Sequence, residues 1–323
     1  MMQQILPLDP VSHERHSIHG ETRIWAETNC YVDVWIELLH GMGLEPIAAL
    51  PFTLAIDFEG DQWTFFKFPL ADLYDLYGLD VQELAIWRSL TAHVQEQVAL
   101  GRPVLVELDS FYLPDTAGTA YRAAHVKSTV AVNAIDVAGL RLGYFHNQGY
   151  HELFGEDFRR VFRLEEPKDS ALLPPYVEFV KQRRPARTGV ELIQTSLRLL
   201  RRQLEMIPKI NPFDKFKTRF QADLEWLSRA SLETFHVYSF ATLRQFGACY
   251  ELAATYLGWL QEKTGMALAS PMDEFSKLAT AAKTMQFHLA RAMSRQRPLD
   301  LSLLDGMART WHAATAELSA ACH

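Results

Sequence analysis

Hydrophobic residues follow a helical period near the start of the chain. In the stretch AETNCYVDVWIELLHGMG, residues 26–43, apolar side chains recur every three or four positions, which is typical of one buried helix face. These side chains are Val34, Trp35, Leu38 and Leu39. Thr28 or Asn29 can cap a helix here, and Gly41 and Gly43 can end it. We therefore predict a helix over this stretch.

The pattern then changes from helix to strand. A second helix is predicted over residues 80–101, whose first residues have the spacing of a capping box. Residues 103–114, PVLVELDSFYLP, have the Val and Leu content of a buried strand that ends at a proline. Residues 125–136 and 140–145 are strand-like and separated by a short turn, which predicts a β-hairpin. The first half should therefore be α+β.

The second half of the chain shows helical spacing only. Residues 166–189 combine prolines with many charges, as a domain linker does. Beyond them, five segments have apolar residues three and four positions apart: 190–207, 212–232, 238–263, 271–295 and 299–320. We predict an α+β domain over residues 1–165 and an all-α helical bundle over residues 190–323.

Composition limits the class of protein. The chain has 323 residues, of which 48% are hydrophobic, and its apolar runs are interrupted by charges well short of a membrane span. The N-terminus shows no secretory signal, so a cytoplasmic protein is expected. Three scattered cysteines argue against a disulfide framework and against a CxxC metal site: Cys30, Cys249 and Cys322.

Charge is distributed unevenly along the chain. The segment Lys181–Arg219 holds eleven basic and three acidic residues, a balance of +8, whereas the whole chain carries −7. Such a segment can attract an acidic partner, or it can be the solvated face of a helix. Nucleic acid is a less suitable partner, because the segment lacks the interleaved aromatic residues or fold signature of a sequence reader.

A cysteine and a histidine have the order that nucleophilic catalysis needs. Cys30 lies at the predicted start of a helix, where free backbone N–H groups and the helix dipole favour a thiolate. His125 opens the first strand of the predicted hairpin, and the paired strand ends in His146 and Asn147, either of which can orient an imidazole. The order of cysteine, histidine and polar residue matches papain-like enzymes. Alternatively, Cys30 is a small buried residue and His125 lies on the surface.

These stretches also resemble a known superfamily. ETNCYVDVWIELLHGMG is similar to the cysteine-bearing helix of the bacteriocin-leader peptidase-like superfamily. GRPVLVELDSFYLPDTAGTAYRAAHVKSTVAVNAID resembles the N-terminal domain of the butirosin biosynthesis protein H family, which implies a papain-like fold. The whole chain also looks like a bacterial family known as domain of unknown function 1839, in which the Trp-x-Glu-Thr-Asn-Cys-Tyr start and a FATLRQFGACYELA-like helix occur together.

The resemblance implies an acyltransferase. In the butirosin protein's family, a cysteine accepts an aminoacyl group from the phosphopantetheine thioester of a carrier protein and passes it to a small amine. By this analogy Cys30 would be the nucleophile, His125 the general base, and the region of Asn29 and Cys30 the oxyanion site. Carrier proteins are typically acidic, so the basic segment at residues 181–219 would have a partner. Phosphopantetheine is expected on that partner only, and the chain itself would need no cofactor.

The third member of the site is where this chain departs from its relatives. They usually have Asp-Pro after the second strand, whereas this chain has His-Asn-Gln at residues 146–148. Asn147 is therefore the expected third member and His146 the alternative. Asp109 and Tyr112 match the family's turn after the central strand, and we expect them to support the His125 loop or the acceptor pocket.

The same residues are compatible with other functions. A cysteine peptidase or amidase would use the same residues, and a catalytically silent protein could still bind a carrier. Three histidines spaced by three could suggest a metal site, but no matching Cys or acid cluster is visible near them, so a polar lead-in is expected: His13, His16 and His19.

Overall fold

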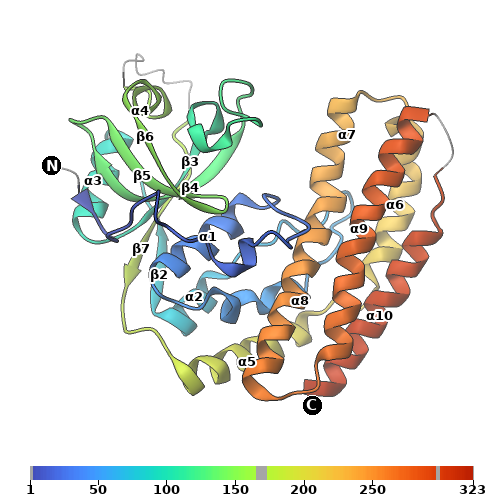
Figure 1. Cartoon of the computed structure of the whole chain (residues 1–323). Coiled ribbons are helices and arrows are strands. Elements are labelled where there is room, and N and C mark those ends of the chain that lie inside the picture. The colour runs from blue at the N-terminus through green and yellow to red at the C-terminus, as the bar shows by residue number, and fades with distance from the viewer. Residues whose placement is uncertain (1–2, 165–172, 296–298, 323) are drawn as a thin grey trace. The chain divides into compact units, whose positions relative to one another are not determined.

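The computed structural model describes residues 3–164, 173–295 and 299–322 (Figure 1). It divides the chain into two compact units. The first comprises Met1–Gly20, Cys30–Pro46 and Leu70–Arg187, and the second comprises Glu21–Asn29, Ile47–Pro69 and Thr188–His323. Both units contain segments that are distant in the sequence, so the predicted order of one domain after the other is interrupted by short crossings of the chain.

The first unit is built on an antiparallel sheet with the order β2-β7-β3-β4-β5-β6, and β1 pairs with β4. The strands are β1 (Gln3–Gln4), β2 (Leu79–Glu83), β3 (Val104–Asp109), β4 (Lys127–Asp136), β5 (Arg141–His146), β6 (Gly149–Phe154) and β7 (Val177–Gln182). Its helices are α1 (Cys30–Gly41), α2 (Leu70–Tyr77), α3 (Leu90–Ala99) and α4 (Gly155–Val161). The predicted α+β class of the first half is confirmed.

Helices α1 and α3 cover opposite faces of this sheet. Val94 of α3 belongs to the apolar core that includes Val130, Val132 and Tyr144. Helix α1 packs on β4 and β5 on the opposite face, toward which Phe145 points. Side chains alternate between faces along a strand, which explains the separation. The contact with α1 is close: a Cβ added at Gly41 would lie 2.7 Å from the Phe145 ring.

Several predicted elements of the first half are confirmed and one is wrong. The helix predicted over residues 26–43 is α1, and the predicted hairpin is β4 and β5. The helix predicted from residue 80 is wrong in its first part, because Leu79–Glu83 is strand β2 and the helix begins only after Ser89, whose side chain caps it. The capping-box spacing misled the prediction, since β2 is defined by pairing with β7, about a hundred residues away along the chain.

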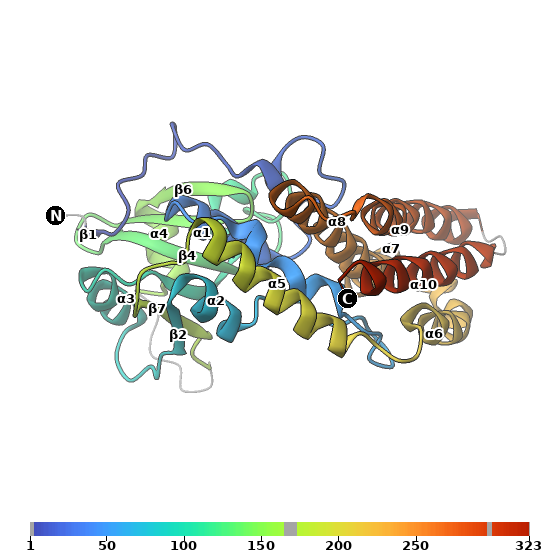
Figure 2. The same ribbon diagram turned by 90° about the horizontal axis from the view of Figure 1, so that it is seen from below.

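The second unit is helical. Its helices are α5 (Gly189–Met206), α6 (Pro212–Leu227), α7 (Leu232–Ser239), α8 (Gln245–Thr264), α9 (Ala269–Arg295) and α10 (Ser302–Cys322), and a π-helical turn (Phe240–Arg244) joins α7 to α8. Within the unit, α9 packs against both α8 and α10 (Figure 2). Asn211 caps α6 by accepting the Phe213 N–H at 3.0 Å, as expected of an Asn-Pro start. The predicted all-α second half is confirmed.

The range predicted as a linker contains structure. Strand β7 lies within residues 166–189 and pairs with both β2 and β3. The beginning of that range, residues 166–172, lies outside the described residues. In the described ranges, no helix is long and apolar enough to cross a bilayer.

Candidate functional site

Asp109 and His125 meet at the two ends of one loop. Asp109 is the last residue of β3, and His125 comes two residues before Lys127, which lies opposite Asp109 in the β3–β4 register. His125 Nδ1 is 2.6 Å from Asp109 Oδ2. The other carboxylate oxygen accepts the N–H of Phe111 at 3.0 Å, so the aspartate is held from both sides. A histidine whose Nδ1 bonds a carboxylate presents Nε2 outward.

The His125 ring is exposed and stacked. It lies parallel to the Phe111 ring at 4.4 Å between centroids and meets Tyr112 edge-on at 6.2 Å. Its side chain is 66% exposed, and among the described residues nothing is hydrogen-bonded to Nε2. The stack and the Asp109 bond fix the ring's plane, while the free nitrogen stays open to a reacting molecule. This is the arrangement of a general base with its orienting group.

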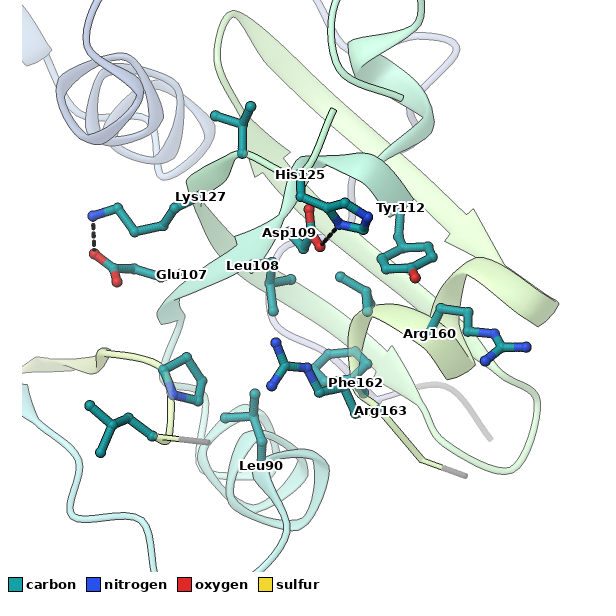
Figure 3. Close-up of a pocket in the computed structure, with 14 residues that line it drawn as sticks. Leu90, Glu107, Leu108, Asp109, Tyr112, His125, Lys127, Arg160, Phe162 and Arg163 are labelled. Atoms are coloured by element: carbon teal, nitrogen blue, oxygen red, sulfur yellow. Dashed lines mark hydrogen bonds and ion pairs between the residues drawn. The ribbon is translucent and has the colours of Figure 1, made fainter. Parts of the chain in front are cut away.

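The pair borders a cavity of about 580 Å³ in the first unit (Figure 3). Apolar side chains form part of its wall among the described residues: Leu90, Leu108, Val161, Phe162 and Leu173. Charged residues surround them, and Lys127 is bound to Glu107 at 2.7 Å. Figure 3 shows Tyr112 beside His125, and Arg160 and Arg163 are among the other residues that line the cavity. Such a lining suits an amphipathic ligand.

Cys30 is the first residue of α1 and is half-buried. Among the described residues the structure shows no hydrogen bond to its sulfur, and Cys30 does not line the cavity beside His125. The next side chain, Tyr31, donates to Glu178 of β7 at 2.9 Å. Asn29 is buried, and its Nδ2 donates to the Phe66 carbonyl at 2.7 Å. The structure therefore places the predicted nucleophile at a helix start and shows no direct contact between it and His125.

His146 and Asn147 lie elsewhere. The buried His146 ring is 2.5 Å from Asp115 through Nδ1 and 2.5 Å from Ser128 Oγ through Nε2. Asn147 is in the left-handed region, with φ 47°, in the turn between β5 and β6. The contact with His125 Nδ1 that we predicted for Asn147 is made by Asp109 instead, a residue for which we expected a supporting role.

Asp115 is the centre of a second buried network. Tyr144 donates its hydroxyl to Asp115 at 2.5 Å, beside the bond from His146. Burial alone raises the pKa of Asp115, but the hydrogen bond and charge of His146 outweigh it and lower that pKa. Ser128, His146 and Asp115 have the bonding order of a serine triad, yet all three are buried. The network fixes the loop between Asp109 and His125 to strand β5.

A third cluster lies where α1 meets the N-terminal segment. Glu37 is buried and accepts bonds from His13 at 3.1 Å, from the His16 N–H at 3.0 Å and from His19. The second ring nitrogen of His19 is 3.3 Å from Asp33. Burial alone raises the pKa of Glu37, but hydrogen bonds from His13 and His19 outweigh it and lower that pKa to about 2.

Sequence reasoning missed this cluster, although a signal was present. Asp33 and Glu37 stand four positions apart within a helix whose neighbouring residues are apolar, so both carboxylates had to be buried and partnered. The three histidines that we predicted to be a polar lead-in supply those partners. Over the described parts of the chain, no group of three or more His, Cys, Asp or Glu residues is arranged to hold a metal ion.

Several basic residues of the segment 181–219 form hydrogen bonds or ion pairs within their own unit. Arg184 donates to the carbonyls of Tyr74 and Asp75 at 2.6 and 2.8 Å, at the end of α2. Arg183 bonds Asp80 at 2.7 Å. In the second unit three more of these cations are paired: Lys215 with Asp57, Lys217 with Asp305 and Arg219 with Asp223. Exposed cations remain on α5 and just after it: Arg198, Arg201 and Lys209.

Comparison with known proteins gives two matches to family models. The DUF1839 N-terminal domain matches residues 14–182, and the DUF1839 C-terminal domain matches residues 189–320. No curated protein matches the chain. The first model ends with strand β7, so the range between the two models is far shorter than the linker that the composition predicted.

Proposed function

The chain belongs to the DUF1839 family, and from its side-chain chemistry we propose that it is a cysteine-dependent acyl or aminoacyl transferase with a papain-like N-terminal domain. Cys30 takes an acyl group from a carrier-protein thioester and passes it to an amine. His125 is the base, and Asp109 orients it. The His125–Asp109 bond of 2.6 Å beside a cavity is the observation that carries this proposal.

Among the three cysteines, Cys30 suits the role best. Burial raises the pKa of Cys249 well above its usual range, and its sulfur donates to the Thr53 carbonyl at 3.3 Å. Burial also raises the pKa of Cys322. Since a thiolate is the attacking species, a raised pKa disfavours both. Cys30 is half-buried at a helix start, where the dipole favours a negative charge.

The reaction has two balanced halves. In the first, the Cys30 thiolate attacks the thioester carbonyl, a carbon–sulfur bond forms to Cys30, and the bond to the carrier sulfur breaks. The departing thiolate takes a proton from the His125 imidazolium. In the second, an amine attacks the new thioester, His125 accepts the amine proton, and the Cys30 thiolate leaves. Both halves require Cys30 and His125 to come within hydrogen-bond reach in the reacting complex.

The test is intact-mass spectrometry after mixing the full chain with aminoacyl thioesters of N-acetylcysteamine and of an acidic carrier protein. We expect a mass gain of one acyl group on the wild type, none on Cys30→Ala, and an unchanged gain on Cys322→Ala. Adding a small primary amine should release the group as an amide. A wild type that gains no mass, or a Cys30→Ala variant that gains it equally, would overturn the transferase proposal.

The same experiment separates the other functions. A hydrolase would release free acid at the same rate with and without the amine, and this would contradict transfer. A carrier-binding protein without catalysis would retain the carrier on a column yet gain no mass, which would also contradict it.

A further inference from the structure

The residues that precede Cys30, Glu21–Asn29, belong to the second unit, and several contacts within that unit hold them. Trp25 is fully buried, and its indole Nε1 donates to the Ala279 carbonyl of α9 at 3.0 Å. The indole lies directly on Gly247 of α8, where an added Cβ would be 2.5 Å from the ring. Lys283 covers the ring, with Nζ 4.5 Å from its centroid. Only glycine permits this close approach, so α8 is shaped to receive Trp25.

A carboxylate on the same helix holds the backbone of this segment. Glu251 lies one helical turn after Gly247, and it accepts the N–H groups of Ile24 and Trp25 at 2.6 and 2.9 Å. Burial raises the pKa of Glu251, while these two hydrogen bonds oppose the rise. A half-buried carboxylate that accepts two backbone donors is a specific anchor for one chain conformation.

Arg244 completes the clamp nearest to Cys30. It is the last residue of the π-helical turn, and its guanidinium donates to the Ala26 carbonyl and to Thr28 Oγ1, both at 3.3 Å. Burial lowers the pKa of Arg244, and the charge of Glu27 opposes that change. π-Helical turns inside long helices are often found at functional sites. Here the turn supplies an arginine to a residue two positions before the thiol.

Resting on the proposed function, we propose that Arg244 is a positioning residue for the Cys30 thiol. The bonds from Arg244 and Glu251 fix residues 24–28, and Asn29 is fixed in turn by the Phe66 carbonyl at 2.7 Å. Cys30 follows in the chain as the first residue of α1. Cys30 therefore follows directly on a segment whose conformation these hydrogen bonds fix.

The test compares Arg244→Met with Arg244→Lys, which keeps a charged donor group but not the planar fork of the guanidinium, and with Arg198→Met as an exposed control. Two quantities are measured: the rate of Cys30 alkylation by iodoacetamide across pH 6 to 9, followed by peptide mass spectrometry, and kcat and KM for acyl transfer. We expect Arg244→Met to lower both the alkylation rate and kcat by about 10-fold, since small displacements of a reacting atom have effects of this size. KM should stay within about twofold, Arg244→Lys should recover part of the loss, and Arg198→Met should match the wild type.

A second variant guards against a general folding defect. Thr28→Val removes the acceptor hydroxyl with little change of shape, and we expect about a threefold loss of alkylation rate with an unchanged thermal midpoint. If Arg244→Met and Thr28→Val alkylate Cys30 at the wild-type rate, positioning by Arg244 is refuted. Alkylation needs no acyl donor. Slower alkylation together with a wild type that transfers no acyl group would therefore support positioning while contradicting the transferase.

Discussion

Acid should destabilise the first unit through His16 before Glu37, its buried neighbour, is protonated. The His16 side chain is almost buried, its Nδ1 accepts the Ile18 N–H at 3.2 Å, and its ring is packed against His40 at 5.2 Å. Burial and the neighbouring His40 lower the pKa of His16 from 6.5 to about 4, although the charge of Glu37 opposes the change. The folded protein therefore keeps this ring neutral at pH values where the unfolded chain protonates it.

The direction and size of the change in the free energy of unfolding follow from this difference in the pKa of His16. Because the folded pKa is the lower one, the contribution of His16 is complete above pH 6.5 and is lost as pH falls from 6.5 to about 4. A shift of this size corresponds to about 3.4 kcal/mol at 1.36 kcal/mol per pH unit. Solvent that reaches the ring edge screens part of this, so we expect a loss of about 2 kcal/mol. Glu37, with its pKa lowered to about 2, loses its contribution only below pH 4.5.

The assay is urea unfolding at several pH values between 8 and 4.5, with hydrogen exchange of the α1 amides to locate the effect. His16→Asn keeps an acceptor for the Ile18 N–H and removes the titrating ring, so its free energy of unfolding should change with pH by about 2 kcal/mol less than the wild type over this range. The control, His236→Asn, alters an exposed histidine on α7 and should keep the wild-type slope. A wild type that is equally stable at pH 7 and pH 4.5, or a His16→Asn variant with an unchanged slope, would refute the reasoning.

Three further predictions concern substitutions in the first unit. Asp109→Asn should lower kcat for acyl transfer by at least about 100-fold by misorienting His125, and a change in KM alone would contradict the role of Asp109. His146→Ala should lower the free energy of unfolding by about 3 kcal/mol in urea because it leaves the Asp115 charge buried and unpaired; a loss under 1 kcal/mol would mean that Asp115 takes up a proton instead. Gly41→Val should cost about 1–3 kcal/mol by overpacking against the adjacent ring of β5, and thermal unfolding at the wild-type midpoint would contradict the close packing.

Local patterns predicted the elements whose contacts are local. Helix α1 and the β4–β5 hairpin depend on neighbours within a few residues, and periodicity identified both. Strands β2 and β7 depend on each other across about a hundred residues of sequence. No local pattern reveals such a partner, so β2 was predicted as helix and β7 as linker.

The residues of the candidate site also differ in how far the sequence predicts them. Residue order led us to predict Cys30 and His125 as site residues, because Cys30 opens a recognisable helix and His125 comes just before a recognisable strand. The partner of His125 was not predicted, since strand order suggested Asn147 on the next strand, whereas the residue bonded to the His125 ring is Asp109 on the previous one. The residue that lies beside His125 is set by how the neighbouring strands are aligned, and this register is a property of the folded sheet.

The β3–β4 loop shows why such a register can be held firmly. The loop is fixed at its centre, where Asp115 bonds Tyr144 and His146 of β5. It is fixed again near its end, where Tyr121 and Arg122 bond Asp157 of α4. Its two ends carry Asp109 and His125, which bond each other. A loop anchored in this way leaves the Asp109–His125 pair little conformational freedom to lose on binding, and such preorganisation is what the proposed role of His125 as a general base would require.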